Sequence, residues 1–206
     1  MVQLSPDTRL DGWDGCGGYH HSDSVIFGFS HTHLSGTGVS DYGDILLMPT
    51  NAVIFNNGAD GTEGYSSSFS HENEEAKAGY YRVKLNDTNI EVELTTTLRA
   101  GIHRYQFASE ENQIIILDLE HRDKLLDHKM EKTSPTTLSG YRHSQAWAAD
   151  QRLFFHIQFS HPIADENFNR EANPTKGAFT LENPQNDPVT VKVGISAVDK
   201  EGAKRN

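Results

Sequence analysis

The fold class is decided by the stretch Arg82-Val83-Lys84-Leu85-Asn86-Asp87-Thr88-Asn89-Ile90-Glu91-Val92-Glu93-Leu94. From Ile90 to Leu94, apolar residues alternate with glutamates, which is the period-two pattern of a strand with one buried face. The segment Arg82–Leu85 alternates in the same way, and Asn86-Asp87 stands between the two segments as a hairpin loop does. The stretch therefore predicts a pair of antiparallel strands.

Short strand-like segments with turn residues between them continue in both directions along the chain. The acidic segment His71–Ala78 has no apolar stripe and is interpreted as a solvated loop. Many short strands without long helical patterns favour a sandwich over a fold of alternating strands and helices. We expect an all-β, two-sheet antiparallel β-sandwich with little helix, forming one domain over residues 1–206. The further predicted strands are Val25–Phe29, Asp44–Met48, Ala52–Phe55, Ile102–Phe107, Gln113–Leu119, Leu153–Phe159, Ala178–Leu181 and Val189–Ala197.

Charge and cysteine content exclude several classes of protein. The 206 residues carry a formal net charge of −11. Nucleic acids and anionic membranes bind clustered Lys and Arg, so we expect neither as a partner. Cys16 is the single cysteine, so no disulfide forms within the chain. The longest aliphatic run, Ile114–Leu117, is too short to span a bilayer, and the start at Met1 lacks the pattern of a signal peptide.

Residues 11–23 form a glycine-rich loop that carries Trp13. Glycines allow a backbone to approach another surface closely. An exposed indole suits stacking on the apolar face of a sugar, because it is large and rigid and still donates one hydrogen bond. The alternative is that Trp13 plugs one end of the sandwich, and the local sequence favours neither interpretation.

A second motif is His31-Thr32-His33, which follows a predicted strand and precedes a turn of Ser, Gly and Thr. Two imidazoles on the same face of a strand can share a metal ion, with a third ligand from Asp23, Asp41 or Asp44. This pattern also opens the metal-dependent amidohydrolase barrels. Such barrels need alternating strands and helices, which the downstream sequence lacks. The alternative interpretation is a pair of hydrogen-bonded histidines at the domain edge.

Other catalytic motifs are not found. The sequence contains no nucleophile elbow, no phosphate-binding Gly-Lys-Ser/Thr loop and no Rossmann glycine pattern. The sequence singles out no pair of carboxylates of the kind that hydrolyses glycosidic bonds.

Several motifs along nearly the whole chain resemble the amino-terminal domain of glycoside hydrolase family 92. The most specific of them is the run from His31 to Gly38. The motifs are Gly12-Trp13-Asp14, Gly18-Tyr19-His20, Gly28-Phe29-Ser30-His31-Thr32-His33-Leu34-Ser35-Gly36-Thr37-Gly38, Tyr42-Gly43-Asp44-Ile45-Leu46-Leu47-Met48-Pro49, Ala78-Gly79-Tyr80-Tyr81, Glu93–Tyr105, Gly140-Tyr141-Arg142, Lys192–Ser196 and Glu201-Gly202-Ala203.

The resemblance implies a parent enzyme that is an exo-acting, calcium-dependent, inverting α-mannosidase. Enzymes of the family carry a sandwich of the galactose-mutarotase type on a larger (α/α)₆ domain. That helical domain holds the acid, the base and the calcium ligands. We therefore expect no catalytic residue, no metal and no hydrolytic activity in this chain alone. The expected partners are the helical domain in cis and a mannose-containing glycan, and the expected location is secreted or periplasmic, with the signal outside this sequence.

The resemblance also implies that two loops form one wall of the sugar-binding pocket. Two other functions stay open: a free-standing carbohydrate-binding module, and a metal-dependent hydrolase that uses His31 and His33. The predicted substrate-binding residues are Trp13, Asp14, Cys16, His31, His33, Gly36 and Thr37.

Overall fold

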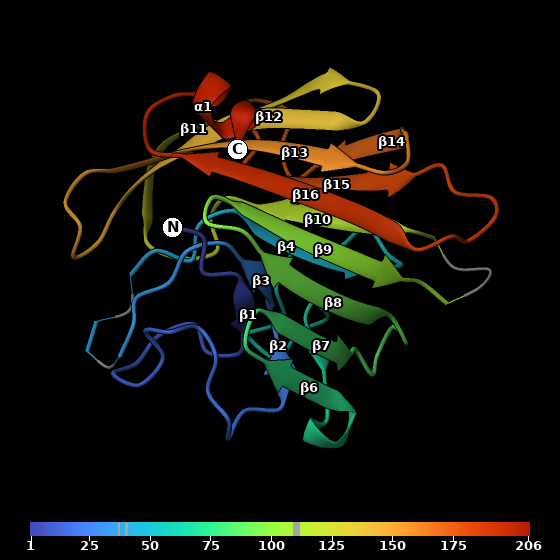
Figure 1. The fold of residues 1–206 in the computed structure, drawn as a ribbon, viewed down its shortest axis with the longest axis horizontal. Helices are drawn as coiled ribbons and strands as arrows, with labels where there is room; N and C mark the ends of the chain where they lie inside the picture. The colour runs from blue at the N-terminus through green and yellow to red at the C-terminus, as the bar shows by residue number, and fades with distance from the viewer. Residues whose placement is uncertain (37, 40, 109–111) are drawn as a thin grey trace.

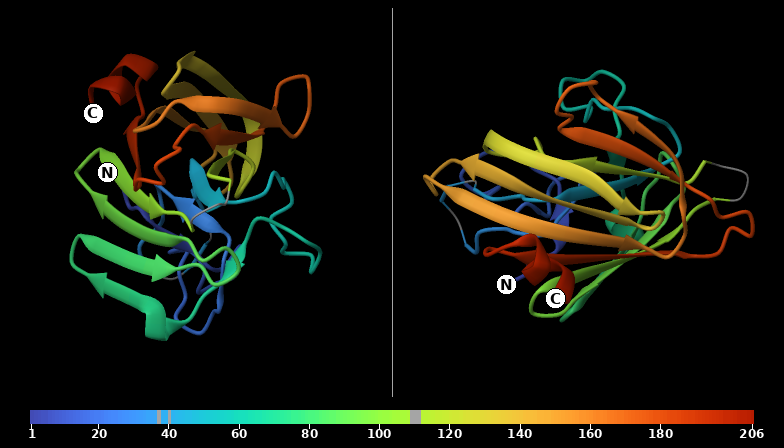
Figure 2. Two further views of the ribbon diagram at one scale, coloured as in Figure 1. Left: turned by 90° about the vertical axis from the view of Figure 1, so that its right-hand side faces the viewer. Right: turned by 90° about the horizontal axis from the view of Figure 1, so that it is seen from above.

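The computed structural model describes residues 1–36, 38–39, 41–108 and 112–206. Two antiparallel sheets pack face to face (Figure 1). Each sheet twists, and their strands cross at an angle when seen from above (Figure 2). The predicted two-sheet antiparallel sandwich is confirmed. The smaller sheet has the order β1 (Ser5–Asp7), β3 (Gly28–Ser30), β4 (Leu46–Thr50), β10 (Ile114–Asp118), β15 (Lys176–Leu181) and β14 (Ile163–Phe168).

The larger sheet has eight strands, and two short strands form a separate pair. The separate pair consists of β2 (Val25–Ile26) and β5 (Ser67–Ser68). The helices are the short 3₁₀ helix η1 (His71–Asn73) and the α-helix α1 (Lys200–Arg205). The larger sheet has the order β11 (Lys124–Ser134), β12 (Thr137–Gln145), β13 (Gln151–Phe159), β16 (Val189–Ser196), β9 (Ala100–Gln106), β8 (Glu91–Thr96), β7 (Tyr80–Lys84) and β6 (Glu74–Lys77).

The hairpin predicted from residues 82–94 forms as β7 and β8. Val83 pairs with Val92, and both side chains are fully buried, while Glu91 and Glu93 point away from the core. The alternation of apolar and acidic residues therefore reports one buried and one solvated face, as the period of two requires.

The two central strands of the smaller sheet are buried on both faces. Every residue of β4 and β10 is buried, which explains their continuous apolar sequences. The inner faces of both strands contribute to the hydrophobic core between the sheets. The outer face is covered by the connection between β4 and β5, because the Tyr65 hydroxyl donates to Asp118 Oδ2 at 2.7 Å. Lys176 also contacts Asp118, at 3.0 Å.

Two predictions about local structure are wrong. Ala52–Phe55 is not a strand: it belongs to this covering connection, where Phe55 packs against the core and its carbonyl accepts from Lys176 Nζ at 3.1 Å. His71–Ala78 is not simply a solvated loop, because it contains η1 and the edge strand β6. β6 pairs with β7 through its backbone, but none of its residues is fully buried. Its sequence therefore shows no alternation of apolar and polar residues.

The sequence pattern did not reveal the hairpin of β11 and β12. Most residues of β11 are exposed or half-buried, because the strand lies at the edge of its sheet. Backbone hydrogen bonds pair β11 with β12, and the side chains of β11 contribute little to the hydrophobic core. The helix α1 contacts β13 and β16 beside the carboxyl end of the chain (Figure 2). Among the described residues, no helix is long and apolar enough to cross a membrane.

Gly140 marks a close approach between β11 and β12, and its replacement tests the packing. A Cβ atom at this position lies 1.8 Å from the Lys129 carbonyl oxygen and 2.6 Å from Phe155 Cζ. We expect Gly140→Ala to lower the free energy of unfolding by about 3 kcal/mol or more, as overpacking against a backbone atom does. Urea denaturation measures this change.

The matched control is Gly17→Ala. A Cβ atom at Gly17 meets nothing closer than the Leu34 carbonyl oxygen, at 3.7 Å. We expect its free energy of unfolding to change by less than about 1 kcal/mol. Equal stability of the two variants would contradict the described register of β11 and β12.

Candidate functional site

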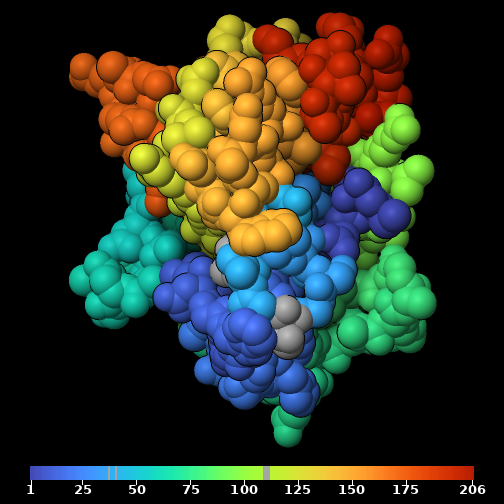
Figure 3. Space-filling model, turned by 90° about the vertical axis from the view of Figure 1, so that its left-hand side faces the viewer, coloured from blue at the N-terminus to red at the C-terminus, as the bar shows by residue number. Residues whose placement is uncertain are grey.

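The two glycine-rich loops of the sequence meet at one end of the sandwich. The Gly38 amide donates to the Trp13 carbonyl at 2.9 Å, and the Cys16 thiol donates to the Gly36 carbonyl. Figure 3 looks onto this end, where the blue segment near residues 11–18 lies against the light-blue segment that follows β3. The structure therefore brings together Trp13, Cys16 and Gly36 as predicted, while Thr37 lies outside the described residues.

Exposure divides the predicted residues into a surface group and a buried group. The Trp13 side chain is 71% exposed, so it is not a plug of the core. Asp14 and Gly36 are exposed as well. Cys16 is buried, and its sulfur is used to fasten one loop to the other. Of these residues, only the exposed ones are placed to touch a ligand.

Two arginines hold the loop that carries Trp13. Arg9 contacts Asp14 at 2.7 Å and Asp23 at 2.6 Å. The hydrogen bond from Arg9 holds the pKa of the Asp14 carboxyl below its usual value. Arg122 reaches the loop from the strand connection after β10 and donates to the carbonyls of Arg9 and Gly15. Because these bonds tie the loop at several points, Trp13 is presented on a restrained backbone.

His31 is the middle of a buried chain of hydrogen bonds. Its Nδ1 lies 2.6 Å from the Ile45 carbonyl, and its Nε2 lies 3.0 Å from His103 Nε2. The carbonyl accepts only, so His31 Nδ1 carries the proton and Nε2 accepts from His103. His103 Nδ1 then accepts from the Tyr105 hydroxyl at 2.8 Å. Burial lowers the pKa of His31 to about 4 and the pKa of His103 well below its usual value, so both rings are neutral at pH 7.

His33 is charged by contrast. Its Nδ1 lies 2.7 Å from the Gln3 carbonyl and its Nε2 lies 2.8 Å from Asp7 Oδ1, so both nitrogens donate. Burial lowers the pKa of His33, but the charge and hydrogen bond of Asp7 outweigh it and raise the pKa overall. Gly18 is required here, because a Cβ atom would lie 2.2 Å from Asp7 Oδ1.

Asp7 was not singled out in the sequence, although it is the centre of this buried polar cluster. The carboxylate is fully buried between His33 and His121, whose Nε2 lies 2.9 Å from Asp7 Oδ2. Burial raises the pKa of Asp7, and the two histidines reverse that effect and hold the pKa well below its usual value. No local pattern reports this role, because Asp7 meets His121 only across the fold.

The two histidines of the motif do not share a metal-binding geometry. They follow β3 instead of lying on one strand face, since β3 ends at Ser30. His33 has no free lone pair, and His31 uses its single lone pair for His103. In the part of the chain that the structure describes, no group of three or more His, Cys, Asp and Glu side chains is placed to hold a metal ion.

The three aspartates considered as further ligands have other partners. Asp23 binds Arg9. Asp44 is fully buried and forms an ion pair with Arg142 of β12, which is also fully buried. Asp44 Oδ2 accepts from Thr32 at 2.7 Å and from Gln151 at 2.6 Å. The Asp44–Arg142 pair therefore joins the two sheets beneath the loops.

Asp41 connects these loops to the turn between β12 and β13. Its Oδ2 accepts from the Ala148 amide at 2.8 Å. The Tyr42 amide donates both to Asp41 Oδ1, at 2.9 Å, and to Asp123 Oδ2, at 2.7 Å. Burial and the neighbouring Asp41 raise the pKa of Asp123 to about 7. The turn between β12 and β13 also carries Trp147, which is 74% exposed. No glycine-rich motif surrounds Trp147, so the sequence does not single it out.

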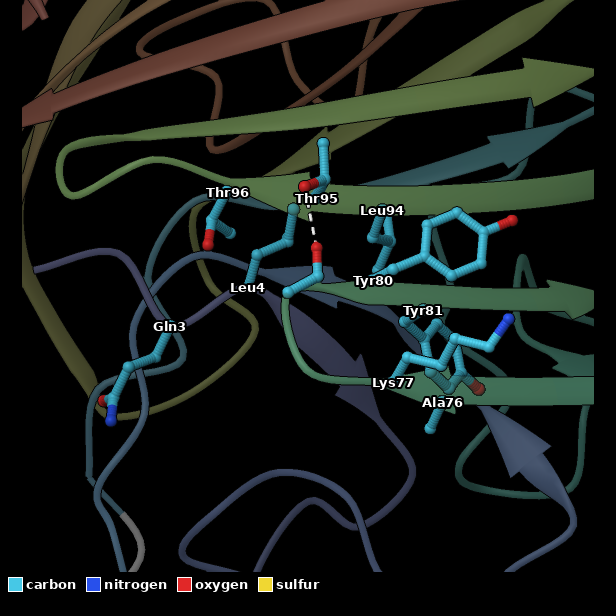
Figure 4. Close-up of a pocket in the computed structure, with 10 residues that line it drawn as sticks. Gln3, Leu4, Ala76, Lys77, Tyr80, Tyr81, Leu94, Thr95 and Thr96 are labelled. Atoms are coloured by element: carbon cyan, nitrogen blue, oxygen red, sulfur yellow. Dashed lines mark hydrogen bonds between the residues drawn. The ribbon is translucent and has the colours of Figure 1, made fainter.

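The described residues form several hollows in and around this region. One, of about 380 Å³, opens beside the motif and is lined in part by Thr32, His33, Tyr42 and Arg152. Another, of about 280 Å³, lies over β6, β7 and β8 and is shown in Figure 4, where the Thr95 hydroxyl donates to a backbone carbonyl at 2.7 Å. The second hollow is lined by these strands and the segment before β1, and not by the glycine-rich loops.

A family model described as the glycosyl hydrolase family 92 N-terminal domain matches residues 1–196. The chain belongs to this family. The structure of a family GH92 alpha-mannosidase from Bacteroides thetaiotaomicron is similar over the whole chain, with a TM-score of 0.87 and 28% identity. The same enzyme in complex with mannoimidazole gives the same values. A GH92 family glycosyl hydrolase called ccman5 has a TM-score of 0.80 and 26% identity over 99% of the chain.

This family 92 domain matches only part of each relative. It covers 31% of the Bacteroides alpha-mannosidase and 30% of ccman5. An uncharacterized secreted glycosidase of Arthroderma benhamiae is 30% identical in a 124-residue alignment that covers 53% of this chain and 15% of that protein. The chain thus spans about a third of its solved relatives.

The neutral histidines make stability depend on pH. Between about pH 6.5, the value for an unfolded histidine, and about pH 4 for His31, the unfolded chain binds protons that the folded domain does not. The free energy of unfolding therefore falls as the pH falls through this window. Each neutral histidine contributes a slope of up to about 1.4 kcal/mol per pH unit. The raised pKa of His33 acts above this window, where its contribution is lost as the pH rises.

We expect His103→Gln to reduce this slope, because one buried imidazole that stays neutral in the folded domain is removed. Urea denaturation at several pH values across the window measures it. The matched control is His21→Gln, since His21 is exposed. A slope that is the same in wild type and His103→Gln would show that His103 is not held neutral.

Proposed function

We propose that this chain is the N-terminal domain, spanning residues 1–206, of a calcium-dependent, inverting exo-α-mannosidase that acts on mannose-containing glycans. The domain supplies one wall of the sugar-binding pocket and the interface to a helical catalytic domain. The observation that carries the proposal is Trp13. It is 71% exposed on a restrained, glycine-rich loop, in a family 92 domain that spans about a third of its solved relatives.

Mannose recognition is supported by the relatives. The 28% identical alpha-mannosidase has a structure in complex with mannoimidazole, and the similarity to that structure covers 100% of this chain. The indole of Trp13 offers a flat apolar face for a sugar ring, and Asp14 beside it offers carboxylate oxygens for hydroxyl groups. The exposed backbone at Gly36 completes this part of the wall.

The buried residues of the motif serve the wall indirectly. Cys16, His31 and His33 are almost fully buried, so they position the loops and do not contact the sugar. His33 fixes the segment after β3 to Asp7 of β1, and His31 fixes it to His103 of β9. The proposed substrate contacts therefore narrow to Trp13, Asp14 and the backbone at Gly36.

Calcium would be held by the helical domain. When bound, it would polarise sugar hydroxyl oxygens as a Lewis acid. The described residues of this chain do not fit a metal, since their buried carboxylates pair with Arg and His side chains. The contribution of this chain is to orient the sugar ring and to exclude water from one side of it.

The parent enzyme and the isolated chain together test the proposal. The parent enzyme should release mannose from an α-linked mannobiose with inverted configuration, seen by NMR, and EDTA should abolish the activity until calcium is restored. The isolated chain should release none. Mannose release by the purified isolated chain would refute the proposal that catalysis belongs to the helical domain. If the isolated chain binds mannobiose but the parent protein has no mannosidase activity, a free-standing carbohydrate-binding module would be favoured.

Replacement of Trp13 by Ala separates a binding role from a structural one. In the full-length enzyme we expect kcat/KM to fall by about 10- to 100-fold, or about 1–3 kcal/mol, as for one lost aromatic contact. The free energy of unfolding of the isolated domain should change by less than about 0.5 kcal/mol, because the side chain is outside the core. Steady-state kinetics and urea denaturation measure the two.

The control is Leu126→Ala, because Leu126 is a half-exposed apolar residue of the edge strand β11. Its kcat/KM should match the wild type. A Trp13→Ala variant with unchanged kinetics and a large loss of stability would refute the binding role.

A further inference from the structure

The second tryptophan of the chain lies on the same end of the sandwich as the first. Trp147 is 74% exposed in the turn between β12 and β13, and Trp13 is 71% exposed. Figure 3 shows the orange segment of this turn directly above the light-blue and blue segments that carry the candidate site. The segments that carry the two tryptophans therefore lie at the same end of the sandwich.

The turn that carries Trp147 is fastened by buried carboxylates. The Ala148 amide donates to Asp41 Oδ2 at 2.8 Å, and Asp41 is only 1% exposed. At the end of the turn, Gln151 Nε2 donates to the buried Asp44 at 2.6 Å. Burying carboxylates is costly unless they are well paired. Since the exposed Trp147 adds little to the core, this anchoring fixes a surface feature.

Trp147 is flanked by alanines, and exposed polar side chains lie at the end of its turn. Asp150 contacts His143 Nε2 at 2.7 Å and Arg152 Nε at 3.2 Å, and the side chains of Asp150 and Arg152 are more than 60% exposed. A flat aromatic face beside exposed donors and acceptors matches a sugar ring. Trp and Arg are enriched at protein–protein interfaces, but Asp is depleted there, and the exposed Asp150 can accept hydrogen bonds from sugar hydroxyls.

The loops that carry the two tryptophans are anchored close to each other along the chain. Trp13 is bonded to Gly38, and the turn of Trp147 is bonded to Asp41. Gly38 and Asp41 are three residues apart, so this stretch of chain spans at most about 11 Å. The turn of Trp147 is therefore anchored near the loop of Trp13 through a short connection.

We propose that Trp147 is a second sugar platform, which binds a unit of the glycan beyond the mannose residue that is released. This inference rests on the proposed mannosidase function. It predicts that Trp147 matters for substrates with several sugar units more than for a mannoside with a small aglycone.

The experiment compares Trp147→Ala, Trp147→Phe and Leu126→Ala with wild type in the full-length enzyme. The readout is the ratio of kcat/KM for a linear α-linked mannotriose to kcat/KM for 4-nitrophenyl α-mannoside. We expect the ratio to fall about tenfold in Trp147→Ala, as for one lost aromatic contact. Trp147→Phe should restore most of it, and Leu126→Ala should leave it unchanged.

Two results would overturn the inference while leaving the proposed function in place. One is an unchanged ratio in Trp147→Ala. The other is an equal loss on both substrates with a lowered melting temperature of the full-length enzyme, which would assign Trp147 to the contact with the helical domain. A wild-type enzyme that hydrolyses no α-mannoside would refute the proposed function itself, and this inference with it.

Discussion

The ion pair between Asp44 and Arg142 is the interaction on which the loop end of this sandwich depends. Asp44 precedes β4 of the smaller sheet and Arg142 belongs to β12 of the larger one, so the pair joins the two sheets. Arg142 also donates to the carbonyls of Leu119 and Arg122, which orders the connection after β10. A buried pair gains little net stability, but loss of one partner leaves an uncompensated charge. Its role here is to fix one arrangement of the loops.

A buried polar layer separates the core from the candidate site. The neutral pair His31 and His103 and the charged pair Asp7 and His33 lie under the loops, and hydrogen bonds join the members of each pair. Such networks are demanding, because each unpaired group inside a protein is costly. The layer explains how an exposed indole can be held in place by a segment that has little regular secondary structure.

The sequence pattern was sufficient to predict a strand where one face of that strand is buried and the other is exposed to solvent. The β7–β8 hairpin and the strands β13 and β16 follow this rule, so their sequences show the alternation of apolar residues. The pattern did not predict the edge strands, or the segments that cover the outer face of a sheet. The side chains of β11 contribute little to the core, and the apolar residues of Ala52–Phe55 cover a sheet without joining it.

For the site, the sequence by itself determined the two glycine-rich motifs and their resemblance to family 92, and this resemblance predicted that Trp13 and the turn at Gly36 lie at one edge of the sandwich. It could not decide which residues of these motifs are exposed. His31 and His33 are two positions apart in the motif, yet one is neutral and one is charged, because their partners His103 and Asp7 come from other strands, far away in the sequence. Burial and long-range partners set the protonation and accessibility of a side chain, and only the tertiary structure supplies both.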